Sequence, residues 1–458
     1  MYGIVCVVPE KFEKLFKINN IDKLQIPREP NDVAALVNSD EVRSAVSTAQ
    51  VNYLPWKEFR NKDWVPEKKE HVWTLVKIQR QASNMPTPIR DKDGSFYQFN
   101  SNSHAEFLYE LTLNFAGTTL GAVNFSESEK RQIIRRNLIE ESIASSKLEG
   151  ANTSREAARR MLNEGRKPRD HGEQMIANNH AAMKRIEEEA KFQPLSLDLL
   201  FDLHRQVTSG TLVNPEHAGA LRQTFDEKGN PLKIMLWDGF TVAYVAPDRE
   251  FVEQELPKLI KFANDEDDGS FIHPLFKAIM LHFWIGLLHP FEDGNGRLAR
   301  ILFYWYMLRK GYWAFSYLSL SEKILNSPMQ YAMAYIYSEQ DNYDLNYFIH
   351  YNISKLKLAR DDLQKYLKKK IEENRKSTQL IQDGHNFNPR QLTLLQYLAK
   401  DEQRNTTMTA YHNINAHIAY VSAVTDLKKL VNSGLLTKRK VGRNVYYFPT
   451  EKVRALFK

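Results

Sequence analysis

Residues 289–300 place a histidine, two acids, two glycines and two arginines within twelve positions. His289 is a side chain that can take a proton from a hydroxyl group near neutral pH. Arg297 and Arg300 lie three residues apart, a spacing that suits more than one phosphate group. Asp293 can hold Mg²⁺, which prefers one or two carboxylates together with phosphate oxygens. The residue types therefore predict a site for the phosphates of a nucleotide, with a base at its rim.

Two helices must position these side chains. The apolar run before His289 is predicted to end there, because Pro290 disfavours helical geometry in the preceding residue. Residues 293–296 (DGNG) are typical of a tight turn, and residues 297–311 predict a second helix that stops at Gly311. The backbone amides of such a loop and helix start form an anion site. A capped interhelical turn with an incidental histidine is the alternative interpretation.

The segment HPFEDGNGRLAR (289–300) resembles the signature of the Fic family, H-P-F-x-[D/E]-G-N-G-R-x-x-R, at every fixed position. A weaker resemblance extends from about 103 to 356, through HAGALRQ and FTVAYVAP before the motif and SPMQYAMAY and YDLNYFIHY after it. Fic proteins are mostly nucleotidyltransferases that move AMP from ATP onto a Ser, Thr or Tyr hydroxyl of a protein. The resemblance implies an all-helical domain with a small β-hairpin flap, ATP as co-substrate and Mg²⁺ as cofactor.

The resemblance also assigns roles to individual residues of this chain. It implies that His289 is the general base, that Phe291 anchors the loop and that Asp293 is the Mg²⁺ ligand. The hairpin signal Asp238-Gly239 lies within residues 234–247. The hairpin around 241–246 resembles a flap that pairs with an extended target segment. The implied ATP-binding residues are Gly294, Asn295, Gly296, Arg297 and Arg300, and the flap residues are Thr241, Val242, Ala243 and Tyr244.

A second short pattern, Ser145-x-x-x-Glu149-Gly150, resembles the inhibitory motif of Fic proteins, [S/T]-x-x-x-E-[G/N]. Glu149 is expected to end a helix just before Gly150, a natural C-terminal glycine. Its carboxylate is predicted to pair with Arg300 in the place that the γ-phosphate needs. A surface glutamate at a helix end is the alternative. Similar glutamates support AMP removal in some Fic proteins, so the reverse reaction stays open.

Residues 388–458 form a basic C-terminal region, with 12 Lys and Arg against 4 Asp and Glu, whereas the whole chain carries a net charge of +7. The pattern of helix, helix-turn-helix, strand, Gly442-Arg443-Asn444 turn and strand resembles a winged helix. The charge favours DNA as a partner, and protein contact or homodimerisation is the alternative. The candidate DNA contacts are Ser422, Thr425, Lys438, Arg439, Lys440 and Arg443.

The composition is that of a globular chain of several domains. The 458 residues are 42% hydrophobic and 26% charged, and the single cysteine, Cys6, fits a reducing compartment. The longest apolar stretch, 276–288, is shorter than a membrane helix requires. We therefore expect a cytoplasmic protein with no membrane partner.

Four regions are predicted. Residues 1–100 have no assigned role and are expected to pack on the Fic domain; residues 101–355 are that domain with its inhibitory helix. The helix over 354–379 has almost no wide apolar face, so residues 356–387 are expected to bridge to the winged helix at 388–458. The leading hypothesis is a protein adenylyltransferase, acting on another protein or on itself, that Glu149 inhibits. Alternatives are a DNA-binding transcriptional regulator with a nucleotide-sensing Fic domain, and a Fic variant that removes AMP or uses another nucleotide.

Overall fold

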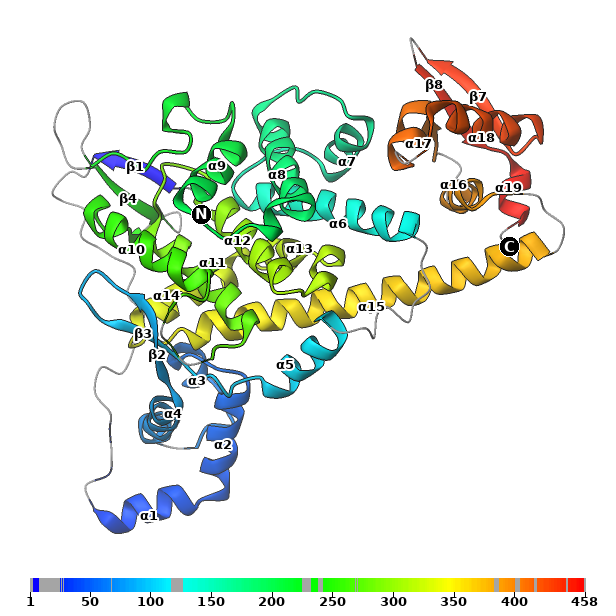
Figure 1. The fold of residues 1–458 in the computed structure, drawn as a ribbon. Helices are drawn as coiled ribbons and strands as arrows, with labels where there is room; N and C mark the ends of the chain where they lie inside the picture. The colour runs from blue at the N-terminus through cyan, green and yellow to red at the C-terminus, as the bar shows by residue number, and fades with distance from the viewer. Residues whose placement is uncertain are drawn as a thin grey trace.

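The computed structural model of the chain is mostly helical with three small antiparallel sheets (Figure 1). This confirms the predicted fold class at that level. The structure describes residues 3–7, 25, 27, 29–66, 68–116, 127–224, 232–237, 242–267, 269, 271–382, 387–399, 404–415, 418–441 and 444–456.

The core of the molecule is built around two consecutive helices, α11 (Pro274–Leu288) and α12 (Asn295–Arg309). Nearly every side chain of both helices is buried, and Trp284 and Trp305 are fully so. Pro274 occupies the first turn of α11, where no backbone donor is needed, and the preceding His273 accepts the Leu275 amide at 3.1 Å. Because both helices are apolar all round, other helices must enclose them.

The enclosing helices belong to one large hydrophobic cluster with α11 and α12. They include α6, whose C-terminal end reaches the loop between α11 and α12, and α9, which lies beside the same loop. The elements of this part are α5 (Ala105–Leu111), a π-helical turn (Thr112–Ala116), α6 (Glu127–Leu148), α7 (Arg155–Glu164), α8 (His171–Glu188), α9 (Leu197–Thr208), α10 (Arg249–Ala263), α13 (Leu320–Leu325) and α14 (Pro328–Gln340), with 3₁₀ turns at Ala190–Phe192, Pro215–His217 and Trp313–Tyr317.

A hairpin lies within this helical part, as the sequence predicted. Strand β4 (Leu232–Trp237) pairs antiparallel with β5 (Val242–Val245). Strand β1 (Gly3–Val7) pairs with the other side of β4, so the sheet order is β1-β4-β5. No signal in the sequence indicated this pairing of the N-terminal segment. Within the described residues, β5 is left as an edge strand.

Residues 30–83 form a separate small helical cluster, at the lower left of Figure 1. It rests on the central part through a buried ion pair of 2.9 Å between Lys77 and Asp341, and through a hydrogen bond of 2.7 Å from Tyr53 to Asp344. Its elements are α1 (Pro30–Asn38), α2 (Asp40–Val51), α3 (Trp56–Phe59) and α4 (Lys69–Ser83), followed by the hairpin of β2 (Met85–Arg90) and β3 (Phe96–Phe99).

Helix α15 (Asn346–Gln382) runs without a break from the central part to the C-terminal elements (Figure 1). The helix over 354–379 was predicted to have almost no wide apolar face, and its first half carries a narrow one. Leu356, Ala359, Leu363 and Leu367 recur at spacings of three or four and are buried in the main cluster. The many charged residues between these four apolar side chains make so narrow a stripe difficult to recognise in the sequence.

The C-terminal unit, α16 to α19, has its own hydrophobic cluster. Its three strands are ordered β6-β8-β7, and β7 and β8 pair antiparallel. Gly442 and Arg443 of the predicted turn between them lie outside the described residues. Its elements are α16 (Pro389–Ala399), β6 (Thr406–Thr407), α17 (Met408–Ile414), α18 (Tyr420–Asn432), β7 (Leu436–Val441), β8 (Asn444–Pro449) and α19 (Glu451–Leu456). No helix among the described residues is both long and apolar enough to cross a membrane.

Candidate active site

His289 is the first residue after α11 and has left-handed backbone geometry (φ 45°, ψ 57°). Its amide donates to the Ile285 carbonyl at 2.9 Å, and its carbonyl accepts from Nε of Arg222 at 2.8 Å. Burial lowers the pKa of His289 from 6.5 to about 4, and the Arg222 charge adds to this; the Glu149 carboxylate, a backbone hydrogen bond with Gly286 and Asp293 act in the opposite direction. The imidazole is therefore neutral at physiological pH and able to accept a proton.

The loop after His289 is closed by the side chain of Asn295. Its Oδ1 accepts from the Phe291 amide at 3.0 Å, and its Nδ2 donates to the Phe291 carbonyl at 2.8 Å. Gly294 has φ +83°, and a Cβ there would lie 2.7 Å from Cγ2 of Thr208. The amide group of Asn295 is thus committed to shaping the loop, so any contact with phosphate falls to its backbone.

His204 on α9 packs against this loop, a contact that the sequence motif did not predict. Its ring stacks on the buried Phe291, with 3.7 Å between centroids and 9° between planes. The Gly219 amide donates to its Nδ1 at 2.9 Å, so Nε2 must carry the proton that is donated to the Asp293 carbonyl at 2.8 Å. The sequence feature that could have identified His204 was its position on the apolar face of α9, between Leu203 and Val207.

Arg297 and Asp293 form an ion pair at the start of α12, with 3.0 Å between Nη2 and Oδ2. The Arg297 side chain is fully buried, and its Nη1 donates to the Val207 carbonyl at 2.7 Å. The Asp293 side chain is 46% exposed, and its Oδ1 accepts from the Gly294 amide at 2.6 Å. Arg297 therefore links the loop to α9 through hydrogen bonds to Asp293 and Val207.

Arg300 contacts the end of α6. Its Nε donates to Oγ of Ser145 at 2.8 Å, and its Nη2 donates to the Ser145 carbonyl at 2.9 Å and to Oε1 of Glu149 at 2.8 Å. The Arg300 side chain is 3% exposed and that of Glu149 is 20% exposed. Gly150 follows with φ +94°, the backbone geometry that turns the chain after α6. Arg300 thus contacts both Ser145 and Glu149, which precede it by 155 and 151 residues in the sequence.

The Glu149 carboxylate also lies over the first turn of α12. A Cβ built on Gly296 would be 2.1 Å from Oε1 of Glu149, so only glycine leaves room for this approach. The first intrahelical bond here joins the Leu298 amide to the Gly294 carbonyl, and the helix offers no partner for the amides before Leu298. An anion is stabilised at such a helix start, and Glu149 occupies that position.

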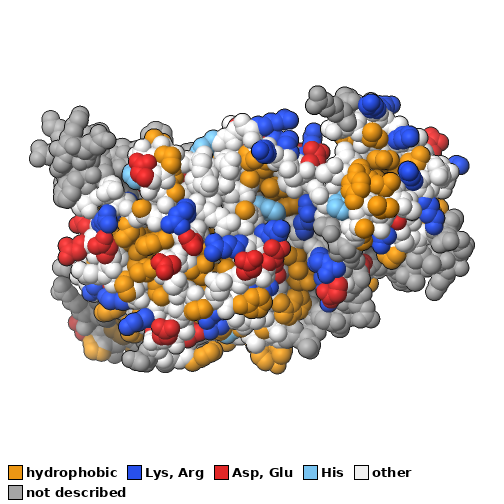
Figure 2. Space-filling model, turned by 45° about the horizontal axis from the view of Figure 1, so that its top comes forward, with side chains coloured by type: hydrophobic (Ala, Val, Ile, Leu, Met, Phe, Trp, Pro, Cys, Tyr) orange, Lys and Arg blue, Asp and Glu red, His pale blue; other side chains and the backbone are white. Residues whose placement is uncertain are grey.

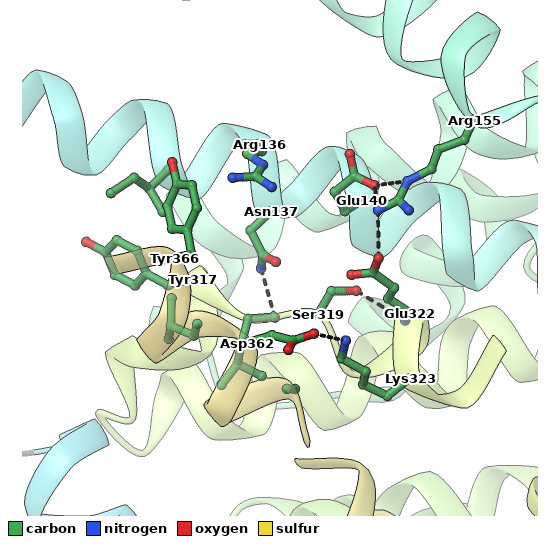
Figure 3. A pocket seen from close by; sticks show the side chains of 14 residues that line it. Arg136, Asn137, Glu140, Arg155, Tyr317, Ser319, Glu322, Lys323, Asp362 and Tyr366 are labelled. Carbon is green, nitrogen blue, oxygen red and sulfur yellow. Dashed lines mark hydrogen bonds and ion pairs between the residues drawn. The ribbon is translucent and has the colours of Figure 1, made fainter. Parts of the chain in front are cut away.

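Helix α6 is held in place on its other side by several polar contacts (Figure 3). Nδ2 of the buried Asn137 donates to the carbonyls of Ser316 at 3.2 Å and Leu318 at 2.8 Å. Arg155 bridges Glu140 of α6 and Glu322 of α13, at 2.6 and 2.7 Å. These contacts line a pocket of about 200 Å³ between α6, α13 and α15, and they fix the helix that Glu149 directly follows.

The hairpin is linked to the loop by Arg222. Its guanidinium donates to the His289 carbonyl and also to the carbonyl of Pro247, just after β5. Val242, Ala243 and Tyr244 lie on the edge strand β5, and Thr241 lies outside the described residues. Neither the sequence motif nor its spacing pointed to Arg222, which lies in the segment HAGALRQ.

No cluster of three or more His, Cys, Asp or Glu side chains among the described residues could hold a metal alone. Asp293 fits Mg²⁺ as a single half-exposed carboxylate, and the other ligands would come from phosphate and water.

On the C-terminal unit, Ser422 and Thr425 lie on α18, and Lys438, Arg439 and Lys440 are exposed on β7. Arg443 lies outside the described residues.

Residues 194–307 match the family model described as Fic/DOC family. This segment contains His204, Arg222 and the loop from His289 to Arg300, whereas Ser145 and Glu149 precede it. Protein adenylyltransferase fic-1 of Caenorhabditis elegans is 34% identical over 118 residues, which cover 26% of this chain and 20% of that protein. Protein adenylyltransferase Fic of Nematostella vectensis is 27% identical over 122 residues, or 27% of this chain and 25% of that protein.

The chain therefore spans about a fifth to a quarter of the length of these relatives. Among solved structures, a Fic family protein from Desulfovibrio desulfuricans G20 aligns over 80% of this chain and 98% of its own, with 15% identity and a TM-score of 0.47.

Proposed function

We propose that the chain is a protein adenylyltransferase, which transfers AMP from ATP to a Ser, Thr or Tyr hydroxyl of a protein or of itself, and that Glu149 inhibits it. The observation that carries this proposal is the position of the Glu149 carboxylate. It pairs with Arg300 at 2.8 Å and lies against Gly296 at the start of α12. A phosphate bound at this helix start would meet the same amides and the same arginine.

The proposed reaction uses His289 as the base. The target hydroxyl loses its proton to the neutral imidazole while its oxygen bonds to the α-phosphorus, and the bond from that phosphorus to the bridging oxygen breaks to release pyrophosphate. Mg²⁺ bound at Asp293 would neutralise charge on the phosphates. Gly294, Asn295 and Gly296 would bind phosphate through their backbone amides, and Arg297 and Arg300 through their charge. Phe291 anchors the loop.

The flap is proposed to hold the target segment. Strand β5 carries Val242 to Tyr244 and is an edge of its sheet within the described residues. An extended peptide can add to such an edge by backbone hydrogen bonds. Because Arg222 contacts both the carbonyl of Pro247, two residues after β5, and the carbonyl of His289, a peptide on β5 would lie next to the base.

The test compares wild type, Glu149→Gly, and Glu149→Gly combined with His289→Ala after incubation with labelled ATP and Mg²⁺. Intact mass reports added AMP. We expect AMP on the Glu149→Gly chain alone, or on a supplied protein target with that variant alone. ATP binding without AMP transfer in any variant would contradict the proposal, and AMP removal from a modified protein or transfer from another nucleotide would then be assayed.

A second function, DNA binding, is supported by the C-terminal unit. Two helices joined by a short connection precede a β-hairpin, an arrangement typical of a winged helix, and α18 would be the recognition helix. Tyr420 and Val421 at its start are 57% and 72% exposed. Lys438, Arg439 and Lys440 on β7 would meet phosphates. A transcriptional regulator that senses nucleotide through the Fic segment, or a homodimer that uses this unit, are the alternative proposals, and we place either activity in the cytoplasm.

A further inference from the structure

The C-terminal unit docks on the helix that carries the inhibitory glutamate. Nη1 of Arg135, on α6, donates to the Asn413 carbonyl at the end of α17 at 3.0 Å. Nδ2 of Asn413 donates to the carbonyl of Asn163 in α7 at 3.0 Å. Gln132 of α6 reaches Oδ1 of Asn415 at 3.4 Å. The C-terminal end of α17 therefore lies against α6 and α7.

The segment beside this joint is strongly basic. Residues 155–170 contain six Lys and Arg against three Asp and Glu. Arg166 is neutralised by Glu173, with two hydrogen bonds of 2.6 and 2.9 Å, but Arg160, Lys167 and Arg169 are exposed and form no salt bridge within the described part of the chain. The loop that follows α7 thus presents positive charge four and six residues after Asn163, the residue that touches the C-terminal unit.

The start of α18 and the strand β7 remain exposed in the docked arrangement. Figure 2 shows Lys and Arg side chains on the C-terminal unit, at the right of the view, and others at the top of the adjoining part. In a helix-turn-helix protein the recognition helix enters the major groove, and the elements on either side contact the two flanking backbones. Here α18 packs against both β7 and α17, and α17 in turn packs against α7.

We propose that the loop between α7 and α8 and the C-terminal unit form one binding face for duplex DNA. This inference rests on the proposed DNA binding by α18 and β7. The loop supplies Lys167 and Arg169, with Arg160, as phosphate contacts beyond the edge of the C-terminal unit. A duplex on this face joins the C-terminal unit to the α6–α7 hairpin, and so stabilises the position of the helix that ends at Glu149.

The experiment measures binding of a fluorescent 24-base-pair duplex of mixed sequence to the full chain, by anisotropy, from 50 to 200 mM KCl. Three paired variants are compared: Lys167→Ala with Arg169→Ala in the loop, Lys438→Ala with Lys440→Ala on β7, and Lys57→Ala with Lys261→Ala as a control. The control lysines are exposed, lie on α3 and α10, and form no salt bridge among the described residues. All three pairs remove the same charge.

We expect the loop pair and the β7 pair each to weaken binding about tenfold and to reduce the slope of log K against log salt by about two, because each phosphate contact contributes roughly 0.9 to that slope. The control pair should change neither quantity. If the β7 pair weakens binding while the loop pair behaves as the control, this inference is overturned and the proposed DNA binding stands. If the wild type does not bind the duplex, both this inference and the proposed DNA binding are wrong.

A further variant, Asn413→Ala, tests whether docking creates the shared face. It removes the hydrogen bond to the Asn163 carbonyl without changing charge. The bonds from Arg135 and Gln132 to the end of α17 remain in this variant. The effect of the loop pair should fall in this background, because the effects of residues that act together are not additive. An unchanged effect of the loop pair would show that the loop binds DNA independently of the C-terminal unit, and would overturn the single face.

Discussion

The Glu149 carboxylate accepts a hydrogen bond from Nη2 of Arg300 at 2.8 Å across 151 residues of sequence. Arg300 is almost fully buried, so its charge would be costly without a partner. Ser145 provides two further acceptors to the same guanidinium. The end of α6 therefore binds an arginine that the proposed reaction needs for phosphate. Arg300 cannot pair with Glu149 and with a phosphate group at the same time.

The close approach of Glu149 to Gly296 leads to a prediction about stability. In Gly296→Ala the new Cβ would overlap Oε1 of Glu149, so the carboxylate must move away from Arg300. We expect the free energy of unfolding to fall by about 1–3 kcal/mol. In the Glu149→Gly background the overlap is absent, and alanine should instead stabilise the helix by about 0.5–1 kcal/mol. Equilibrium urea unfolding of the four chains gives both values; equal changes in the two backgrounds would contradict the contact.

Asn137 leads to a prediction about the inhibitory helix. Its buried amide donates to two carbonyls outside α6, those of Ser316 and Leu318. Asn137→Ala leaves both without this donor, and we expect a loss of about 1–3 kcal/mol in the free energy of unfolding. AMP incorporation should rise above that of wild type, because α6 is less firmly held.

The matched control for this change is Asn61→Ala. Nδ2 of Asn61 donates to one carbonyl, that of Lys57, on the exposed surface. Its loss should change the free energy of unfolding by no more than about 0.5 kcal/mol and leave AMP incorporation unchanged. A stable Asn137→Ala chain with no change in AMP incorporation would show that these contacts do not restrain α6.

The sequence predicted the parts of the site that depend on local signals. Pro290 and Gly294 mark the ends of α11 and the loop. The Asp238-Gly239 signal predicted a hairpin, and although these two residues lie outside the described part, β4 and β5 on either side of them pair antiparallel. The contacts of His204 and Arg222 with the loop were not predicted. Each depends on packing between segments separated by 67 or more residues, and neither residue type nor spacing specifies such a partner.

Two side chains of the motif have contacts that the sequence could not distinguish. Asn295 and Arg297 were predicted at the phosphates, but the Asn295 amide closes the loop and Arg297 is buried against Val207. A polar side chain at a helix start can face either the ligand or its own loop, and only the packing decides which. For the same reason the charged sequence of α15 concealed the buried stripe that includes Leu363 and Leu367.

His204 leads to a prediction about pH and stability. Burial lowers its pKa from 6.5 to about 4, so between these values the unfolded chain binds the proton and the folded chain does not. Stability from this residue is therefore fully present above pH 6.5 and is lost as the pH falls toward 4. For one such group, the free energy of unfolding falls by about 2 kcal/mol between pH 7 and pH 5. We expect His204→Gln to have a lower free energy of unfolding than wild type at pH 7. On acidification to pH 5, its free energy of unfolding should fall by about 2 kcal/mol less than that of wild type. Urea unfolding at both pH values measures these differences. An equal loss in both chains would mean that His204 is protonated in the folded protein.

His289 leads to a prediction about the pH dependence of AMP transfer, measured in the Glu149→Gly chain. Its pKa of about 4 includes an upward contribution from the Glu149 carboxylate, so removal of Glu149 lowers the pKa further. The imidazole is then unprotonated throughout pH 5–8, and the rate should show no acid limb from His289 in that range. Initial rates at saturating ATP in buffers of constant ionic strength provide the profile, with His289→Ala in the same background as the zero-rate control. A rate that falls tenfold per pH unit below an apparent pKa near 6.5 would show that the base is a more exposed group than the buried His289.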